Sequence, residues 1–340
     1  MAGFVRQNSQ MTMFGIFIGS ILLGWALCFP VQAWLKKKDI WDNPNERSSH
    51  EEPTLRGGGL ASLILMVSVI VFWVCPENTK FGCAWLAGLV ILTWVSLSDD
   101  RQEVSIILRV AAQVVAVGLV SWTIPENNFT WWELFIIGFV LVSYINFVNF
   151  MDGINGLVAG LMILIPLGMV LVIPGIHWMP QIIALALAGS AAGFLPFNFP
   201  RAKMFLGDVG SITMGFSSGV LILWVWIGMP SGSSQLPLLL FPLYFFLEGS
   251  VAILRRIMAR EEWWKPHREH FYQRLIRCGW SHSRTTAIIL CIQCLITLLI
   301  WKAVGGGWST AFSWALCMLV WTVFFAYVEL LFRASSKSDI

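Results

Sequence analysis

Charged residues are scarce in this chain of 340 residues. Asp, Glu, Lys and Arg make up only 12% of it, and hydrophobic residues make up 57%, whereas soluble globular domains carry about 25% charged and 45–50% apolar residues. The apolar residues come in runs of about 17 to 25, each long enough to cross a hydrocarbon core as a helix. This composition excludes a soluble enzyme fold for most of the chain, and the formal net charge of only +3 argues against nucleic acid as a partner.

The cysteines do not form a disulfide framework. There are seven, an odd number, and most lie inside apolar runs, so we interpret them as small residues that face lipid or neighbouring helices. Cys291 and Cys294 form one CxxC, but without a second pair or a nearby His a metal or redox role is not favoured. The first apolar run lacks a small-residue cleavage site and is expected to be a retained span.

Hydropathy, interrupted by Pro, Gly and charge, predicts an all-α polytopic membrane protein that forms a single domain over residues 1–340. We expect about eleven transmembrane helices. The predicted spans are 11–34, 59–75, 82–98, 105–124, 131–150, 155–173, 180–196, 209–228, 236–254, 284–303 and 308–331.

The distribution of Lys and Arg predicts the orientation of these spans. One set of loops holds nearly all of the 22 basic residues and leaves only Arg6, Lys80 and Lys302 for the other face. Because short loops rich in Lys and Arg stay in the cytoplasm, we expect a periplasmic amino terminus and a cytoplasmic carboxyl terminus. No internal repeat supports a transporter built from inverted halves.

Five polar clusters interrupt the apolar pattern, and the predicted topology places all five at the cytoplasmic ends of spans or in cytoplasmic loops. They read RSSHEEPTLRGGG, SDDR, NFVNFMDGINGL, FLGDVGS and HREHFYQRL. Polar groups beside hydrocarbon are costly unless they line a cavity or find partners. We therefore expect one cytoplasmic site formed by the loops 35–58, 99–104, 150–154, 197–208 and 255–283.

Adjacent carboxylates and a stripe of polar side chains stand out within these clusters. Asp99 and Asp100 close the third span. Two adjacent carboxylates beside lipid raise the pKa of one group or demand a nearby cation. The alternative is that both simply lie in a solvated loop at the membrane interface. Asn146, Asn149 and Asp152 are spaced i, i+3, i+6 and are expected near one helical face. Hydrogen bonding between helices is the alternative explanation for the Asn residues.

Asp208 lies between Gly207 and Gly210 at the predicted start of a span. A capping carboxylate explains that position by itself. Together with Asn149, however, Asp208 would supply oxygen ligands for a hard cation that keeps waters and substrate phosphates in its shell, as Mg²⁺ does.

The 255–283 loop is the longest polar stretch of the chain. Such a loop can simply face water and lipid headgroups, but HREHFYQRL interleaves hydrogen-bond donors with aromatics, which suits contacts with phosphate and sugar. Zinc binding by His267 and His270 lacks nearby Cys and is not favoured.

Carboxylates, basic residues and an opening at the membrane surface together indicate phosphoryl transfer between a soluble donor and a lipid acceptor. Bringing two phosphates together juxtaposes anions, and two unit charges at about 4 Å repel by about 4 kcal/mol at an effective dielectric near 20. A metal ion with an Arg and His clamp relieves that repulsion.

SDDR, NFVNFMDGINGL, FLGDVGS and the His-containing loop, in this order, resemble the polyprenyl-phosphate N-acetylhexosamine-1-phosphate transferases of bacterial glycosyltransferase family 4. This family includes the phospho-MurNAc-pentapeptide translocase, and the resemblance covers residues from about 45 to 280. It implies catalytic roles for Asp99, Asp100 and Asp152 and Mg²⁺ ligation by Asn149 and Asp208, with Mn²⁺ as a substitute. The residues assigned to substrate binding are Arg56, Asn146, Asn155, Arg201, Lys203, His267, Arg268, His270 and Arg274.

The resemblance implies transfer of an N-acetylhexosamine-1-phosphate from a UDP-sugar to undecaprenyl phosphate, with release of UMP, at the cytoplasmic face of the bacterial inner membrane. A homodimer is the expected assembly. Many members carry Asp where this chain has Asn155, which argues against a second carboxylate there. The HREHFYQRL form is similar to members that initiate O-antigen with 6-deoxy sugars such as FucNAc or QuiNAc, with GlcNAc as the other candidate.

Two other functions fit the sequence less well. A transporter or flippase of lipid-linked sugars would need polar residues at mid-span and on both faces, whereas the predicted outer face is sparse in them. A CDP-alcohol phosphotransferase would carry Ala-Arg shortly after its Asp-Gly, where this chain has Ile154 and Asn155. Direct displacement and a covalent aspartyl-phosphate intermediate both stay open.

Overall fold

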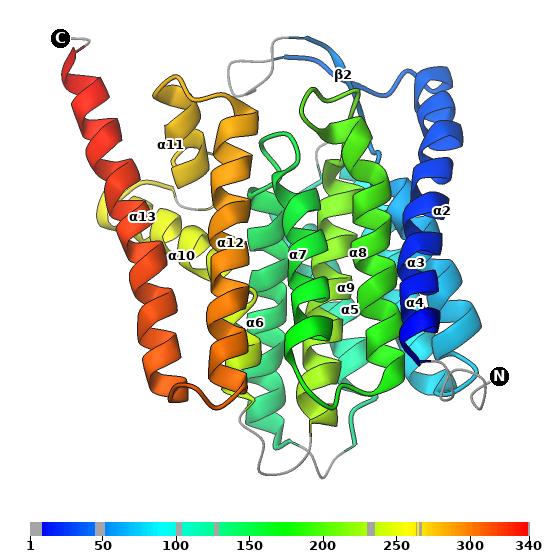
Figure 1. The fold of residues 1–340 in the computed structure, drawn as a ribbon. Coiled ribbons are helices and arrows are strands. Elements are labelled where there is room, and N and C mark those ends of the chain that lie inside the picture. Colours follow the sequence, from blue (N-terminus) through cyan, green and yellow to red (C-terminus); the bar gives the residue numbers. More distant parts are fainter. Residues whose placement is uncertain are drawn as a thin grey trace.

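The computed structural model describes residues 9–44, 52–99, 104–125, 129–229, 235–262, 264 and 267–338. These residues form a bundle of long, roughly parallel helices, as expected of an all-helical membrane protein (Figure 1). Seven of the described helices are long and apolar enough to cross a membrane. They are α2 (Ser9–Lys37), α4 (Thr79–Asp99), α6 (Trp131–Phe150), α8 (Trp178–Asn198), α9 (Gly207–Gly228), α12 (His282–Val304) and α13 (Thr310–Ser338).

Three shorter apolar segments lie between these helices. They are α3 (Leu60–Val69) with its continuation η1 (Ile70–Val74), α5 (Ile106–Ser121) and α7 (Leu157–Val172). Their bounds and those of the longer helices lie within a few residues of the spans predicted from hydropathy, except at the end of α13. The number of eleven membrane crossings and the orientation of the chain stay predictions.

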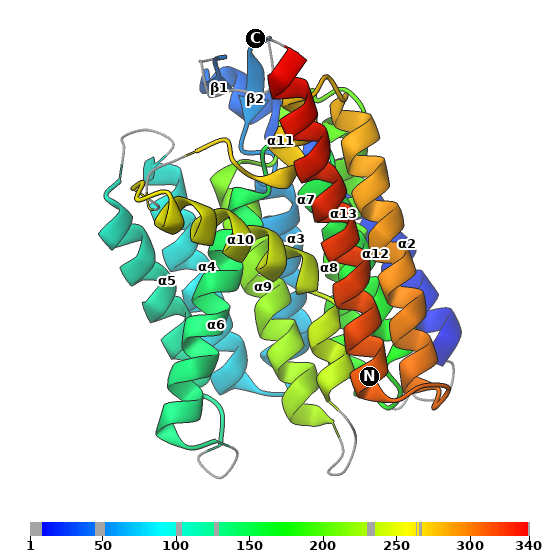
Figure 2. The same cartoon turned by 90° about the vertical axis from the view of Figure 1, so that its left-hand side faces the viewer.

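The predicted span 236–254 is wrong as a continuous helix. The segment begins as a short 3-10 helix, η2 (Leu236–Leu240), and resumes after Pro242 as α10 (Leu243–Met258). Because Pro lacks an N–H and its ring clashes with the preceding turn, a regular helix does not run through this position. The change of direction lets α10 cross the bundle obliquely (Figure 2), and a short helix, α11 (Phe271–Arg277), follows in the 255–283 loop.

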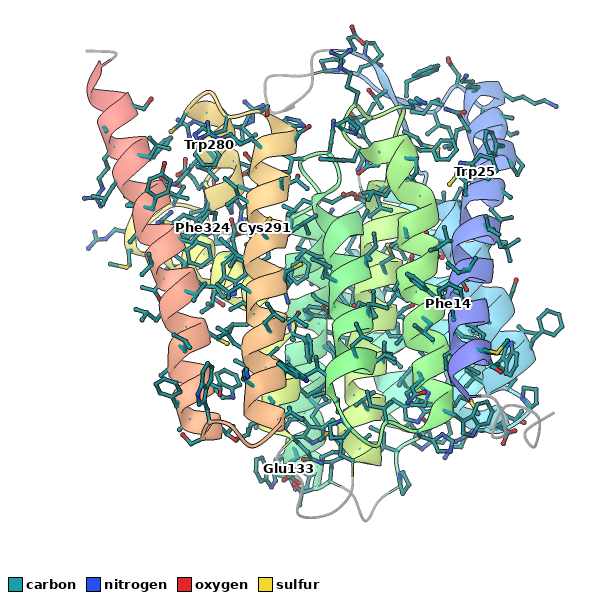
Figure 3. All side chains as sticks on the ribbon, in the orientation of Figure 1. Phe14, Trp25, Glu133, Trp280, Cys291 and Phe324 are labelled. Atoms are coloured by element: carbon teal, nitrogen blue, oxygen red, sulfur yellow. The ribbon has the colours of Figure 1, made fainter. Side chains whose placement is uncertain are left out.

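The centre of the bundle and its outer surface differ in how much each helix is buried. In the most apolar windows of α8 and α9, 78% and 83% of residues are buried, against 22% in α2 and α12. On α2, Phe14 and Trp25 point outward (Figure 3) and are 68% and 46% exposed. Large apolar side chains exposed in this way fit contact with lipid rather than water. The packed core is therefore built around α7, α8 and α9.

A small three-stranded sheet lies at one end of the bundle (Figures 1 and 2) and was not predicted. Its strands are β1 (Trp41–Asp42), β2 (Thr54–Arg56) and β3 (Met204–Phe205), in the order β1-β2-β3. β1 and β2 are antiparallel, whereas β2 and β3 are parallel, with Leu55 opposite Met204 and Arg56 opposite Phe205. The sheet thus joins the RGGG segment to the FLGDVGS segment across about 150 residues of sequence.

The orientation can be tested by site-directed cysteine labelling. In a chain without native cysteines, single cysteines at Lys38 and Arg260 should resist a membrane-impermeant maleimide added to intact cells. A cysteine at Asn127, which lies outside the described residues, should react, because the loops rich in Lys and Arg are retained in the cytoplasm. Labelling of the Arg260 position from outside would contradict a single cytoplasmic site.

Candidate active site

The RGGG segment packs directly against the beginning of α9. The backbone N–H groups of Gly57 and Gly58 donate to the carbonyl of Phe205 at 3.3 and 2.8 Å, and Gly59 donates to Leu206 at 2.9 Å. A Cβ on Gly59 would collide with the backbone of Gly210. Glycine is therefore required where two backbones approach this closely.

This packing brings Arg56 to Asp208. The guanidinium Nη2 of Arg56 lies 2.8 Å from Oδ1 of Asp208, and the Asp208 side chain is only 17% exposed. Asp208 lies in the first turn of α9, where the helix dipole also favours a carboxylate. Helix capping alone therefore does not explain Asp208, because Arg56, from a distant segment, is bound to the same carboxylate.

Asp152, in the turn after α6, belongs to the same cluster. Burial raises the pKa of Asp152 well above its usual value, and the nearby carboxylate of Asp208 raises it further. The guanidinium of Arg56 and a hydrogen bond with the backbone of Gly207 act in the opposite direction. The structure thus brings together Asp152, Asp208 and Arg56, which the sequence predicted for one site.

Asn149 completes the link between α6 and α9. Its Oδ1 accepts a hydrogen bond from the hydroxyl of Ser211 at 2.7 Å, and the same hydroxyl lies 3.2 Å from the carbonyl of Gly207. The amide oxygen of Asn149 therefore lies on the side of α6 that faces the beginning of α9.

The donor set at this junction fits a hard divalent cation. Asp152 and Asp208 supply carboxylate oxygens, and the charge of Asp208 raises the pKa of Asp152, an effect that a cation would relieve. Asn149 adds an amide oxygen. Among the described residues, no group of three or more His, Cys, Asp or Glu side chains is arranged to hold a metal ion. A cation here would therefore have few protein ligands. A cation held here would keep positions for water and substrate phosphate, as Mg²⁺ does.

Asn146 lies on a different side of α6. Its amide exchanges hydrogen bonds with Gln113 of α5 at 2.6 and 3.3 Å, and Gln113 is buried. Each step of three residues along a helix falls about 60° short of a full turn, so the predicted stripe drifts and its first member faces a neighbouring helix. This contact is the hydrogen bonding between helices that was weighed for the Asn residues.

Asp99 forms a second polar cluster beside the first. Its carboxylate accepts a hydrogen bond from the backbone N–H of Val104 at 2.8 Å and pairs with Arg109 of α5 at 3.0 Å. Asp100 lies outside the described residues. Asp99 and Arg109 line a small recess with Leu92, Val95, Ser96, Gln113 and Ile212. Ile212 is one turn beyond Asp208 on α9, so the recess adjoins the carboxylate cluster.

We call the HREHFYQRL stretch, residues 267–275, the histidine loop. A buried carboxylate holds it. Glu248 of α10 contacts Nδ1 of His270 at 2.6 Å and accepts a hydrogen bond from the backbone N–H of Phe271, also at 2.6 Å. His270 is only 4% exposed, and the ring of His267 stacks on it. Burial, followed by His270 and Arg256, lowers the pKa of His267 to about 4, so this imidazole is neutral at physiological pH.

Tyr272 connects this loop to the carboxylate cluster. Its hydroxyl donates a hydrogen bond to the carbonyl of Phe150, the last residue of α6, at 2.9 Å. The same hydroxyl occupies the space that a Cβ on Gly153 would need. Since Asp152 lies between Phe150 and Gly153 in the chain, the histidine loop is packed next to the turn that carries it.

The remaining predicted residues lie around this centre. Arg274 is buried and pairs with Glu269 at 2.6 Å and with Glu329 of α13 at 2.7 Å, so its guanidinium ties α11 to α13. Asn155 donates to the carbonyl of Pro200 at 3.1 Å. Arg201 and Lys203 have exposed side chains before β3, and Arg268 is partly exposed in the histidine loop.

Sequence reasoning missed several residues that hold the site together, chiefly Glu248, Tyr272 and Ser211. Glu248 carried a signal, because a lone carboxylate inside a predicted apolar span is costly unless it is paired. Tyr272 and Ser211 lie within the polar clusters HREHFYQRL and FLGDVGS, but nothing in the sequence distinguishes these two from their neighbours. Only the tertiary contacts identify these two.

The fold and the site define a polytopic membrane protein that gathers carboxylates, amides and cations at one end of an apolar bundle. Residues 83–226 match the family described as glycosyl transferase family 4. The chain is 30% identical over 288 residues to the decaprenyl-phosphate N-acetylglucosaminephosphotransferase of Mycobacterium leprae (strain TN), with 72% of each chain covered. It is 27% identical over 271 residues to the probable undecaprenyl-phosphate N-acetylglucosaminyl 1-phosphate transferase of Bacillus subtilis (strain 168), with 76% and 75% covered.

A third relative is similar over a longer stretch. The undecaprenyl-phosphate alpha-N-acetylglucosaminyl 1-phosphate transferase of Escherichia coli (strain K12) is 24% identical over 327 residues, which cover 88% of this chain and 85% of the relative. The chain belongs to glycosyl transferase family 4. The resemblance found in the four ordered motifs is thereby confirmed at the level of the family.

The raised pKa of Asp152 predicts a pH dependence of stability. The folded protein binds this proton more tightly than the unfolded chain, so stability falls as pH rises from the unfolded value of about 4 through the raised folded pKa. With EDTA present and above that window, Asp152→Asn should therefore unfold at a higher temperature than wild type in detergent, and the difference should disappear near pH 4. Asp42→Asn, in β1, is the matched control. A lower midpoint for Asp152→Asn at every pH would contradict the electrostatic assignment.

Proposed function

We propose that this protein transfers N-acetylhexosamine-1-phosphate from a UDP-sugar to undecaprenyl phosphate and releases UMP, in a reaction that depends on Mg²⁺. The proposal extends to a cytoplasmic active site at the bacterial inner membrane and to initiation of O-antigen or a related envelope glycan. The relatives described above are named for polyprenyl-phosphate acceptors and for N-acetylglucosamine phosphate transfer. These names support GlcNAc among the candidate sugars.

The observation that carries the proposal is the convergence of Asp152, Asp208, Asn149 and Arg56 at one end of the bundle. Catalysis of phosphoryl transfer consists mostly of positioning and neutralisation of charge. This cluster combines oxygen ligands for a metal with the positively charged guanidinium of Arg56. A transporter would use polar groups along its length. Here the ionisable residues of the cluster gather where α6 ends and α9 begins.

The residues of this cluster would bind the metal ion and the donor phosphates. Asn149 and Asp208 would hold Mg²⁺, which when bound neutralises the charge of the donor phosphates, with the catalytic candidate Asp152 in the same cluster. Arg56, already paired with Asp208, is placed to turn toward a phosphate once a metal compensates that carboxylate. Binding at this junction orients the donor pyrophosphate beside the recess that contains Asp99.

In the transfer step, an oxygen of the lipid phosphate attacks the β-phosphorus of the donor. The bond from that phosphorus to the oxygen bridging to the α-phosphate breaks, and UMP leaves with the bond's electrons. Asp99 accepts the proton of the lipid phosphate as a general base, a role that typically contributes about 10²- to 10⁴-fold. Arg109, paired with Asp99 at 3.0 Å, keeps the carboxylate in position.

The activity is tested with purified protein, undecaprenyl phosphate and a panel of UDP-N-acetyl sugars that includes GlcNAc, FucNAc and QuiNAc. We expect UMP release and a lipid-linked product with at least one sugar, and a cut of about 10²- to 10³-fold in Asp208→Ala and Asn149→Ala, since each removes stabilisation of developing charge. Both variants should also require more Mg²⁺.

Asn198→Ala provides a control for structural damage at the same end of the bundle. Asn198 accepts a hydrogen bond from Gly156 N–H at 2.7 Å and donates to the Met204 carbonyl at 3.1 Å, so its loss should lower stability without changing Mg²⁺ dependence. Near-normal activity of Asp208→Ala and Asn149→Ala at low Mg²⁺ would exclude the assigned ligands. Absence of product with every sugar would exclude the proposed reaction.

The histidine loop is expected to act on the donor. His270→Ala should raise the KM for the UDP-sugar by roughly ten- to hundredfold, because a charge-assisted hydrogen bond is worth about 1.5–3 kcal/mol, and should leave the KM for the lipid nearly unchanged. Glu248→Gln keeps the shape but changes the partner of Nδ1, and it should reproduce the effect. Glu133→Gln is the control. Glu133 lies in the first turn of α6, at the end of that helix far from Asp152, and its substitution should leave both KM values unchanged. A selective effect on the lipid would place the loop on the acceptor side.

A further inference from the structure

Two cysteines that are distant from the site lie against each other where η1 meets α4. Cys75 follows η1 directly, and Cys83 lies in the second turn of α4. The chain reverses between them, because a Cβ on Gly82 would lie only 2.5 Å from Sγ and 3.0 Å from Cα of Cys75. Since Cys83 is the next residue after Gly82, its backbone lies beside the thiol of Cys75, which is free in this structure, as is that of Cys83.

The turn between the two cysteines is polar and open. Pro76, Glu77, Asn78, Thr79 and Lys80 are exposed. Asn78 caps α4 by accepting a hydrogen bond from the N–H of Phe81 at 3.0 Å, and Thr79 donates to the carbonyl of Cys75 at 2.9 Å. The ammonium of Lys80 lies over the ring of Trp122. These contacts fix both cysteine backbones while leaving Cys83 exposed.

The pair lies at the opposite end of α4 from Asp99, the last residue of that helix. If Asp99 faces the cytoplasm, as the distribution of Lys and Arg predicts, then Cys75 and Cys83 face the compartment outside the inner membrane. Disulfides form and persist there, whereas the cytoplasm keeps thiols reduced. The pair Cys291 and Cys294 differs, because both lie exposed in the middle of the apolar helix α12 (Figure 3 shows Cys291).

We infer that Cys75 and Cys83 form a disulfide that joins η1 to α4 on the outer face of the membrane. The two thiols lose two protons and two electrons as the S–S bond forms. The disulfide of a thiol–disulfide oxidoreductase in that compartment accepts them and becomes a dithiol. The bond would close a short loop and fix the outer ends of α3 and α4, whose other ends lie beside Gly59 and Asp99.

The test counts thiols by intact mass. Membranes from aerobically grown cells are quenched in acid, denatured and alkylated with N-ethylmaleimide, with or without prior reduction. Of the seven cysteines, we expect five to be alkylated without reductant and all seven after reduction. Digestion without reductant should yield a peptide pair that contains Cys75 and Cys83 and is 2 Da lighter than the two thiol peptides.

Two single variants make the assignment specific. Cys75→Ser should show six adducts with and without reductant, because its former partner is left as a thiol. Cys291→Ser, the matched control, should show four adducts without reductant and six after reduction. Seven adducts on unreduced wild type, or a missing pair that maps to other cysteines, would overturn the inference, and neither outcome depends on the transferase activity.

Discussion

Two carboxylates, Asp152 and Asp208, belong to one cluster at one end of an apolar bundle. Burial raises the pKa of Asp152 well above its usual value, and the charge of Asp208 raises it further. Arg56 supplies one positive charge, so the three side chains carry a net charge of −1 whenever both carboxylates are ionised. An arrangement that costs stability in this way is typical of sites where a cation or a reacting group completes the set of charges.

The cluster depends on three segments, distant in sequence, that meet through backbone and side-chain contacts. Parallel pairing of β2 with β3 and the close approach of Gly59 to Gly210 fix the position of Arg56. The contact between Asn149 and Ser211 fixes α6 against α9. A side chain at Gly59 or Gly210 would collide with the facing backbone and would therefore displace the segment that carries Arg56.

Most helices were predictable because long apolar runs determine them locally. The break at Pro242 was passed over because an average over a window is insensitive to one residue, and strands of two or three residues have no periodicity to detect. Asp152, Asn149 and Asp208 were predicted together because each is a costly polar residue beside hydrocarbon. The contact of Asn146 with Gln113 was not predicted. Residues spaced by three turn progressively around a helix, so the first and last members of the stripe face different neighbours.

The histidine loop limits where the positive charge for substrate phosphates can come from. Burial, together with His270 and Arg256, holds the pKa of His267 near 4, so this imidazole contributes hydrogen bonds rather than charge at physiological pH. Arg274 is already committed to Glu269 and Glu329. In the proposed reaction, compensation of a pyrophosphate would therefore fall on Arg56, on a bound metal and on the exposed or partly exposed cations Arg201, Lys203 and Arg268. The buried His270, fixed by Glu248, holds the loop in place.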